Sequence, residues 1–493
     1  MNTQLFLLLI PYVFLFTSIL YKKRHRILRL LMYTSIAIIA TYLYSSRSID
    51  TISLVLALPS TYVSLFISLY TDTYSEENRY PPYLPVLIDS FSLTMISAFI
   101  APNLLGLVTM WTIAELVGFI LVSIGEKHSI EGGTKASKIF LFISTMKFEL
   151  SVFTLIAIAS LTVVGASTAV AWYEPLTIPY WELAKLGIEI PLFALPLAII
   201  GFITKMGLVP LHFWLPEAHS VAPSPASALL SGVMTAMGVY GLLRLVEIYT
   251  MDHTFLVYTL LLLGSLSIIY GGLQSAIQRD GKKLLAYSTI AGNGFTALAL
   301  SYYVYTFSPI GLATLLVAVL SHMGYKTTLF LNTGLLEQTT GFRYIHRSRG
   351  LATITPLASA GGLLALFSLI GIPPTAGFTA KLLLLIELIS SLDTVTGLLL
   401  LASIAYIVIS VIIALTYAKV YFGEPSSLLG FGNRKIGVLQ EYSALLTGAS
   451  SILFVLVIAV YPGLYQYLTF YVLSSPLVLL IAYLFITVAR RKV

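Results

Sequence analysis

The chain has 493 residues, of which 58% are hydrophobic and only 10% are charged. Soluble globular chains carry about 25% charged residues, so this composition is typical of a protein that lies in a membrane. The chain contains no cysteine, which excludes disulfides, thiolate nucleophiles, cysteine-ligated iron–sulfur clusters and the common zinc sites. The formal net charge is +7, but the basic residues lie in short segments between apolar stretches, where they set membrane orientation rather than bind nucleic acid.

The apolar stretches predict an all-α polytopic membrane protein with about 14–15 transmembrane helices, since a span needs about 20 apolar residues. The first stretch lacks the basic leader and the small-residue cleavage site of a secretory signal, so we expect it to be retained as a span. The predicted spans lie near residues 4–20, 26–45, 51–70, 82–101, 103–124, 138–165, 189–217, 225–248, 255–277, 283–306, 309–336, 355–390, 396–421, 442–463 and 466–488.

The lysines and arginines between the spans predict which connections are cytoplasmic. Alternate connections are rich in these residues, and they are 21–29, 126–138, 278–283, 341–350, 430–437 and the tail 489–493. The other connections have almost none, as in 101–103, 250–254, 305–309 and 390–394. Because one missed span would invert this bias downstream, the alternation supports the count. We therefore expect a multi-pass protein of the cytoplasmic membrane with an external amino terminus and a cytoplasmic carboxyl terminus.

Two predicted spans are unusually long and contain helix breakers. Residues 189–217 include three prolines, and residues 355–390 include Gly371, Pro373, Pro374 and Gly377. A break at membrane depth is tolerated where the freed backbone groups are buried in protein or line a cavity; a simple proline kink is the alternative. The two breaks lie five spans apart, and an odd period predicts two inverted five-helix repeats, each with a discontinuous helix.

This repeat divides the chain into four parts. Residues 1–80 are predicted to form amino-terminal transmembrane helices, and residues 81–248 the first five-helix repeat. Residues 249–422 are predicted to form the second, inverted repeat, and residues 423–493 a carboxyl-terminal loop with further transmembrane helices. No stretch of polar sequence is long enough to bury a core of its own, so no soluble domain is expected.

Glu115 and Lys205 are the first candidates for an ion path. Ionisable groups at helix centres cost at least about 2.5 kcal/mol each, so each one is a functional hypothesis. Glu115 lies midway along its span and needs a basic partner to stay charged. Lys205, near the first break, is the expected partner, and the pair could exchange protons if its separation changed. A static ion pair that only fixes helix register is the alternative.

Three further ionisable residues are candidates for the same ion path. Lys381 is interpreted as occupying the corresponding place in the second broken span. Between the breaks, His322 and Lys326 are four residues apart and share one helix face. A histidine on an apolar face is more often a satisfied core residue than a proton carrier, but the neighbouring lysine adds a second titratable group.

Other ionisable residues are weaker candidates. Lys138 is close enough to the cytoplasmic end of its span to reach the interface, whereas Lys147 is deeper and retains a possible role. Arg244, at a helix end, is expected to be interfacial. A group of residues has the chemical type of metal ligands but lacks a known ligand spacing, so no metal site is predicted; it consists of His212, Glu217 and His219.

Four motifs, in order, resemble one family of membrane proteins. They are ITKMGLVPLHFWLPEAHSVAPSPASALLSGVMTAMGVYGLLRL (203–245), IQRDGKKLLAYSTIAGNGF (277–295), SHMGYKTTLFLNTG (321–334) and GIPPTAGFTAKLLLL (371–385). They are similar to the antiporter-like subunits of respiratory NADH:quinone oxidoreductase, of Mrp-type sodium/proton antiporters and of archaeal membrane-bound hydrogenase and sulfur-reductase complexes. The resemblance covers about residues 50–465.

The resemblance implies a core of fourteen helices with two inverted five-helix repeats and a row of charged residues along the membrane midplane. Glu115 falls on the family's glutamate and Lys205 on its paired lysine. His322 and Lys326 fall on the central relay, and Lys381 falls on the terminal lysine or glutamate. In the respiratory complexes, redox chemistry in neighbouring subunits drives this row.

Two departures from the family pattern lie in the middle of the row. Family members usually carry a lysine where this chain has Ala236, and several relatives have a histidine where this chain has Gly292. We expect the route from Lys205 to the centre to lack a charged step, unless Thr235, Lys282 or a bound water bridges it. A degenerate copy that no longer conducts is therefore an open alternative.

The leading hypothesis is an ion-translocating subunit, for H+ and/or Na+, of a redox-driven complex of the archaeal hydrogenase or sulfur-reductase type. The expected partners are other membrane subunits, including homologous antiporter-like subunits, and the lipid bilayer. No cofactor is expected in this chain, because iron–sulfur or NiFe centres would lie in partner subunits, and no enzymatic chemistry is assigned to it. The alternatives are a subunit of an Mrp-type Na+/H+ antiporter and a structural copy without transport. A substrate transporter is disfavoured, because no substrate-binding group is found at the midplane.

Overall fold

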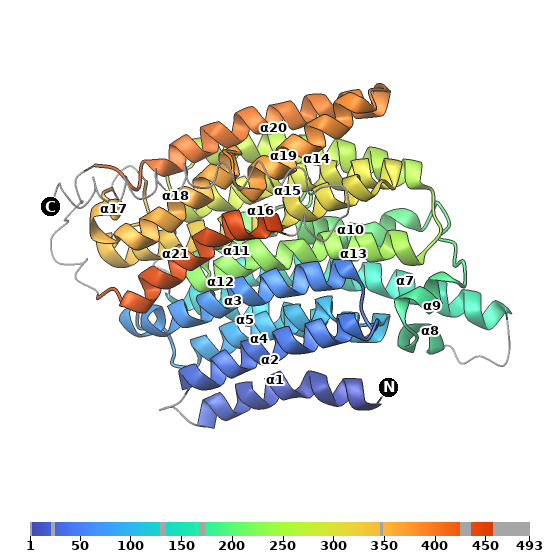
Figure 1. Cartoon of the computed structure of the whole chain (residues 1–493), viewed down its shortest axis with the longest axis horizontal. Helices are drawn as coiled ribbons and strands as arrows, with labels where there is room; N and C mark the ends of the chain where they lie inside the picture. The colour runs from blue at the N-terminus through green and yellow to red at the C-terminus, as the bar shows by residue number, and fades with distance from the viewer. Residues whose placement is uncertain are drawn as a thin grey trace.

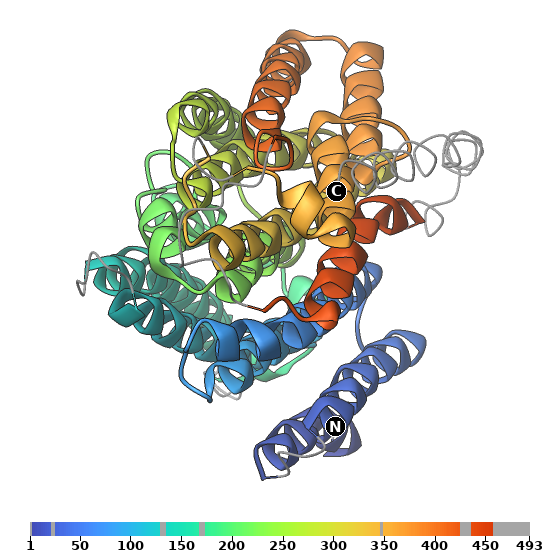
Figure 2. The ribbon, with the colours of Figure 1, turned by 90° about the vertical axis from the view of Figure 1, so that its left-hand side faces the viewer.

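The computed structural model describes residues 2–20, 25–128, 135–166, 173–345, 349–423 and 435–456. Nearly all of these residues are helical, and within them the only β pairings are two isolated bridges. The long helices run roughly parallel to one another in a single bundle (Figure 1). Seen along the helices, α1 and α2 form a pair at one edge (Figure 2). The predicted all-α polytopic membrane fold is confirmed.

The helices follow one another with short connections. They are α1 (Asn2–Leu20), α2 (His25–Ser45), α3 (Thr51–Glu77), α4 (Leu84–Phe99), α5 (Leu104–His128), α6 (Lys135–Ile139), the π-helical turn η2 (Phe140–Thr145), α7 (Met146–Ala166), α8 (Glu174–Thr177), α9 (Tyr180–Ala184), α10 (Leu195–Met206), α11 (Trp214–Val221), α12 (Ser224–Leu229), the π-helical turn η3 (Leu230–Met234), α13 (Thr235–Ile248), α14 (His253–Ile277), α15 (Gly281–Thr306), α16 (Pro309–Thr340), α17 (Leu351–Ile354), α18 (Pro356–Ile370), α19 (Ala376–Ser390), α20 (Thr394–Ala418) and α21 (Val438–Leu453).

Within the described ranges, nine helices are long and apolar enough to cross a membrane, and four shorter apolar helices accompany them. Each of the first fourteen predicted spans coincides with a helix or with consecutive helices. The end of the span predicted at 442–463 and the whole of 466–488 lie outside the described residues.

The bundle is apolar outside and partly polar inside, as a protein in lipid requires. Large apolar side chains cover its surface, with Phe193 84% and Leu161 73% exposed. Helix α16 runs through the interior and is buried along most of its length. Several of its threonine hydroxyls donate to carbonyls one turn earlier, as Thr327 does to Met323 at 2.8 Å. These threonines can therefore line the interior with their hydroxyl donors paired.

Both long spans are broken, as predicted. Helix α10 ends at Met206, and Gly207 follows in the left-handed region with a φ of +69°. Helix α18 ends at Ile370, and Gly371 follows with a φ of +92°. In each predicted repeat, 81–248 and 249–422, the broken helix is the fourth span. The inverted relation between the repeats stays a prediction.

Helices α18 and α21 approach so closely that their backbones touch through two glycines. A Cβ atom on Gly448 would lie 2.4 Å from the Cα of Gly361, and a Cβ on Gly361 would lie 2.4 Å from the carbonyl oxygen of Ala444. Small residues at such a crossing allow close packing inside a membrane. Helix α21 thereby supports the first half of the second broken helix.

We expect Gly448→Ala to lower the thermal unfolding midpoint of the detergent-purified protein, because the added methyl group forces the α18 and α21 backbones apart at a cost of about 1–3 kcal/mol. Gly397→Ala in α20 is the matched control, since the nearest atom to its new Cβ lies at 3.9 Å and alanine is the better helix former. Equal midpoints for the two variants would contradict this packing.

Candidate functional site

Glu115 and Lys205 form an ion pair in the interior of the bundle. Helix α5 carries Glu115 and helix α10 carries Lys205, and the Lys205 Nζ contacts the Glu115 Oε1. Both side chains are 0% exposed. The structure thus brings together the two residues that the sequence paired.

Three neighbours complete the hydrogen bonds of this pair. Trp111 Nε1 donates to Glu115 Oε1 at 3.1 Å, and Thr145 Oγ1 donates to Oε2 at 3.1 Å. Lys205 Nζ also donates to Ser144 Oγ. Ser144 and Thr145 both belong to the π-helical turn η2, which was not predicted. The irregular turn places two adjacent hydroxyls on the pair, a use typical of π-bulges at functional sites.

The end of α10 is favourable for a cation. Lys205 lies in the last turn of that helix, where the carbonyl ends of the peptide dipoles attract positive charge. Its Nζ lies 5.4 Å from the centroid of the Phe140 ring and 5.3 Å from that of Trp214, within the range of cation–π attraction. The Met206 carbonyl accepts from Asn293 Nδ2 at 2.6 Å, which joins the break to α15.

Lys326 lies at the centre of the bundle on α16 and is 0% exposed. Its Nζ donates to the Leu285 carbonyl at 3.0 Å and to Ser288 Oγ. Within the part of the chain that the structure describes, no carboxylate pairs with Lys326. Its surroundings therefore differ from those of Lys205, because only dipoles stabilise the charged form.

His322 lies one turn before Lys326 on the same helix and is 4% exposed. The Tyr325 hydroxyl lies 3.0 Å from His322 Nδ1. That hydroxyl also lies 3.3 Å from the hydroxyl of Tyr406 on α20. Neither tyrosine was singled out from the sequence, because a phenol on an apolar helix does not differ from an ordinary core aromatic.

The position of Lys381 differs from the one interpreted from the sequence. Lys205 lies before its break, whereas Lys381 lies after the second break, in α19, so the two lysines do not occupy corresponding places in the chain. The ammonium of Lys381 nevertheless returns to the end of α18. It donates to the carbonyls of Leu369 and Ile370, both at 2.7 Å, and to Ser410 Oγ at 2.8 Å. Each broken helix thus holds an ammonium group at the end of its first half.

Within the described residues, neither Thr235 nor Lys282 makes a hydrogen bond or ion pair that joins Lys205 to the centre. Thr235 turns its hydroxyl back to the Ser231 carbonyl of its own chain segment, at 2.6 Å. Lys282 lies instead at the start of α15, where it donates to the Ala222 carbonyl at 2.9 Å and lies 3.5 Å from Glu337 Oε2. In the described ranges of the chain Lys282 makes no hydrogen bond or ion pair with Lys205 or Lys326, and its role as a bridge stays a prediction.

Hydroxyl groups occupy part of this region. Ser231 Oγ, in the π-helical turn η3, lies 2.7 Å from Thr289 Oγ1. Thr289 in turn donates to the Leu285 carbonyl at 2.8 Å, and that carbonyl accepts from Lys326. These contacts give Lys326 a polar connection toward the position of Ala236, which the sequence did not reveal.

The weaker candidates lie away from the row. Lys138 is exposed at the start of its span and Lys147 is half-buried. The described residues contain no group of three side chains that could hold a metal ion. His219 is fully buried and stacks on Phe330 at 4.7 Å, and neither of its ring nitrogens has a hydrogen-bond partner among the described residues.

The sequence also missed a cluster of buried charges near the predicted cytoplasmic end. Arg29, which falls where the predicted connection 21–29 overlaps the predicted span 26–45, lies in α2 and is 4% exposed. Its Nε lies 2.7 Å from Asp89 Oδ2, and its Nη1 contacts Asp72. The Tyr33 hydroxyl donates to Asp89 at 2.9 Å. This cluster ties α2, α3 and α4 together.

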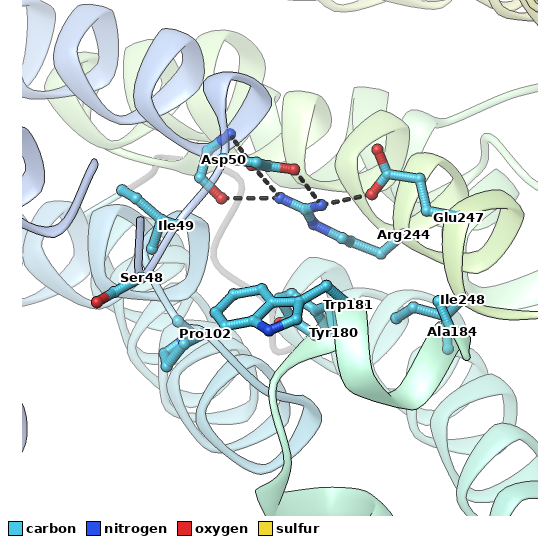
Figure 3. Close-up of a pocket in the computed structure, with 12 residues that line it drawn as sticks. Ser48, Ile49, Asp50, Pro102, Tyr180, Trp181, Ala184, Arg244, Glu247 and Ile248 are labelled. Carbon is cyan, nitrogen blue, oxygen red and sulfur yellow. Dashed lines mark hydrogen bonds and ion pairs between the residues drawn. The ribbon is translucent and has the colours of Figure 1, made fainter. Parts of the chain in front are cut away.

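A second cluster lines a cavity of about 220 Å³ at the predicted external end (Figure 3). Arg244, on α13, donates to both oxygens of Asp50, at 2.6 and 2.7 Å, and to Glu247. Its guanidinium lies over the rings of Tyr180 and Tyr240, at 4.9 and 4.7 Å. Arg244 is thus 4% exposed although it lies near a helix end. Burial raises the pKa of Asp50, but the hydrogen bonds and charge of Arg244 outweigh this effect and lower it overall.

The chain is similar to known membrane proteins in sequence and in fold. A family model described as "NADH:quinone oxidoreductase/Mrp antiporter, TM" matches residues 90–410. The NAD(P)H-quinone oxidoreductase chain 4 2 of Trichodesmium erythraeum (strain IMS101) is 30% identical over 321 residues, which are 63% of this chain and 53% of that protein. This chain therefore spans about half the length of that relative.

Two solved structures share the fold. A chain of the Mrp complex from Dietzia sp. DQ12-45-1b has a TM-score of 0.73 at 18% identity, covering 95% of this chain and 96% of that chain. A chain of the membrane-bound sulfane sulfur reductase, an archaeal respiratory membrane complex, has a TM-score of 0.74 at 21% identity, covering 91% and 75%. At these identities the likeness establishes the fold alone.

We expect Asp50→Asn to destabilise the protein by about 1 kcal/mol, because Asp50 is partly exposed and solvent screens part of its bond to Arg244. A lowered pKa in the folded state means that this stabilisation is present above the unfolded aspartate pKa, about 3.9, and is lost as the pH falls through the lower folded value. Unfolding midpoints of wild type and variant should therefore differ by a constant amount from pH 5 to 8 and converge in stronger acid. Glu182→Gln, an exposed carboxylate on α9, is the control. A difference that disappears already at pH 6 would contradict the assignment.

Proposed function

Because residues 90–410 match its model, the chain belongs to the NADH:quinone oxidoreductase/Mrp antiporter family of transmembrane proteins, and we propose that it translocates H+, Na+ or both within a multisubunit membrane complex. In this proposal it is an antiporter-like subunit of the cytoplasmic membrane, with an external amino terminus and a cytoplasmic carboxyl terminus. Its partners are other membrane subunits, including homologous antiporter-like subunits.

The observation that carries the proposal is the buried ion pair of Glu115 and Lys205 beside a broken helix. A fully buried pair gives no advantage in stability over apolar side chains, because desolvation costs several kcal/mol per ion. Each partner can exist in two protonation states, and the balance between them depends on their separation. A change in that separation would therefore move a charge, which a static packing contact cannot do.

The row continues through the other candidates. His322 and Lys326 on α16, and Lys381 between the broken helix and α20, are all buried polar groups with dipolar partners. Charged residues in a membrane interior typically mark ion pathways and proton relays. We assign Glu115, Lys205, His322, Lys326 and Lys381 to one ion-translocation path.

For the kind of complex, we propose a redox-driven assembly of the archaeal hydrogenase or sulfur-reductase type. The similarity in fold to a chain of an archaeal sulfane sulfur reductase supports this choice. In such a complex the iron–sulfur or NiFe centres lie in partner subunits, and this chain holds no cofactor. An Mrp-type Na+/H+ antiporter is the second candidate, supported by the similarity to a chain of the Dietzia Mrp complex.

A non-conducting structural copy remains the third candidate. Ala236 has no ionisable group to offer between Lys205 and the centre, and among the described residues Lys282 forms no hydrogen bond or ion pair that joins the two. The Ser231 and Thr289 hydroxyls argue for conduction instead, because they extend the polar surroundings of Lys326 to η3, in the chain segment just before Ala236. Measurement of transport decides between the two.

We expect Glu115→Gln and Lys205→Met each to reduce ion transport by the reconstituted complex by about tenfold or more, because proton-transferring groups contribute about 10²–10⁴-fold. Transport is measured with a pH-sensitive dye in vesicles. Glu182→Gln, on α9, and Lys185→Met, directly after α9, change exposed residues and are matched controls. Full transport by both interior variants in an intact complex would support the structural copy.

The driving force for transport separates the two transporting assemblies. If the complex is redox-driven, adding its electron donor should start transport, and the ion is identified by whether Na+ changes the rate at fixed pH. If it is an Mrp-type antiporter, an imposed Na+ gradient alone should drive H+ movement, without any electron donor.

A further inference from the structure

The interval between His322 and Lys381 is crossed by two tyrosine hydroxyls. His322 Nδ1 lies 3.0 Å from the hydroxyl of Tyr325, which lies 3.3 Å from that of Tyr406. The three side chains come from two helices, α16 and α20, and all are buried. The ring of Tyr406 stacks on Phe295 at a centroid distance of 4.6 Å, which holds its hydroxyl in place.

A glycine makes room for this contact. A Cβ atom on Gly292 would lie 2.6 Å from His322 Nδ1 and 2.7 Å from the Tyr325 hydroxyl. Both distances are shorter than a carbon atom tolerates, so any larger residue on α15 would displace one of the two groups. The absence of a side chain at Gly292 is thus a condition for the hydrogen bond between His322 and Tyr325.

A small cavity lies between these hydroxyls and Lys381. It has a volume of about 10 Å³, and its lining includes Tyr325, Tyr406, Ser368 and Lys381. This volume is near the lower limit for one water molecule, and the lining offers the several polar partners that a buried water needs. The Lys381 Nζ lies 5.0 Å from the centroid of the Tyr406 ring, and its hydrogen bonds go to Leu369, Ile370 and Ser410 rather than to the Tyr406 hydroxyl.

We propose that the hydroxyls of Tyr325 and Tyr406, with one water in this cavity, form the proton connection between His322 and Lys381. This inference rests on the proposed function and specifies that the mobile species in this part of the row is H+. A hydroxyl both donates and accepts a hydrogen bond, so each tyrosine can pass a proton without ionising. Na+ finds no carboxylate ligand in this interval within the described residues.

The transfer conserves protons at every atom. Protonated His322 gives its Nδ1 proton to the Tyr325 oxygen as Tyr325 gives its hydroxyl proton to the Tyr406 oxygen. Tyr406 gives its own proton to the water, and the water gives one to the neutral amine of Lys381. His322 ends neutral, Lys381 ends charged, and both phenols are regenerated. Rotation of the hydroxyls resets them.

Removal of single hydroxyls tests the connection. In the complex reconstituted in vesicles, Tyr325→Phe and Tyr406→Phe should each lower H+ transport by about tenfold or more. The ratio of rates in H2O and D2O should rise in both variants, because the impaired proton transfer becomes rate-limiting. A purely structural role would not change that ratio.

Tyr417→Phe is the matched control. Tyr417 is also on α20 and is also buried, and its hydroxyl bonds to α16 at the Leu329 carbonyl, 2.9 Å, and at Thr333, 2.8 Å. The Tyr417→Phe variant loses an equivalent buried hydroxyl between the same two helices, but this hydroxyl does not bond to any residue of the proposed ion path. Its transport and isotope ratio should match those of wild type.

Gly292→Ala tests the same contact without removing a hydroxyl. It should reduce transport as Tyr325→Phe does, because the new methyl group separates His322 from Tyr325. Wild-type transport and isotope ratio in both Tyr→Phe variants, with Glu115→Gln inactive, would overturn this inference and leave the proposed function standing. Wild-type transport in Glu115→Gln as well would overturn the proposed function itself.

Discussion

The arrangement of residues inside this bundle depends on how the protein stabilises a charged side chain that has lost its water of hydration. An ion in a medium of low dielectric is tolerated only where protein atoms replace its hydration. The three central lysines use three different replacements. Lys205 has a carboxylate, Lys326 has a carbonyl and a hydroxyl, and Lys381 has two carbonyls and a hydroxyl. Each solution requires particular backbone geometry nearby.

That requirement explains where the helices depart from regularity. A regular helix uses its carbonyls internally, whereas the last carbonyls of a helix have no internal partner and are free to accept from a side chain. The breaks after Met206 and Ile370 create such ends inside the bundle. The π-helical turn η2 has the same effect for hydroxyls, because it directs Ser144 and Thr145 to the ion pair. Irregular backbone and buried charge are therefore two aspects of one arrangement.

Sequence reasoning succeeded where a residue is chemically unusual for its surroundings. Glu115 and Lys205 are rare residue types in apolar helices, and the breaks contain prolines and glycines, so both were predictable. It failed where the residue type is common and only the position of the residue in the fold reveals its role. Tyr325 resembles a core aromatic, and π-helical turns have no clear sequence signal.

Lys381 also connects charge to backbone shape. An ammonium has three N–H groups, and those of Lys381 meet three acceptors: Leu369, Ile370 and Ser410. A neutral amine has two N–H groups, so loss of the proton must release one acceptor. If a carbonyl is released, the end of α18 loses a bond that holds it to α19. The helix break can thus report the protonation state of one side chain to the whole of α18, and through the glycine contact to α21.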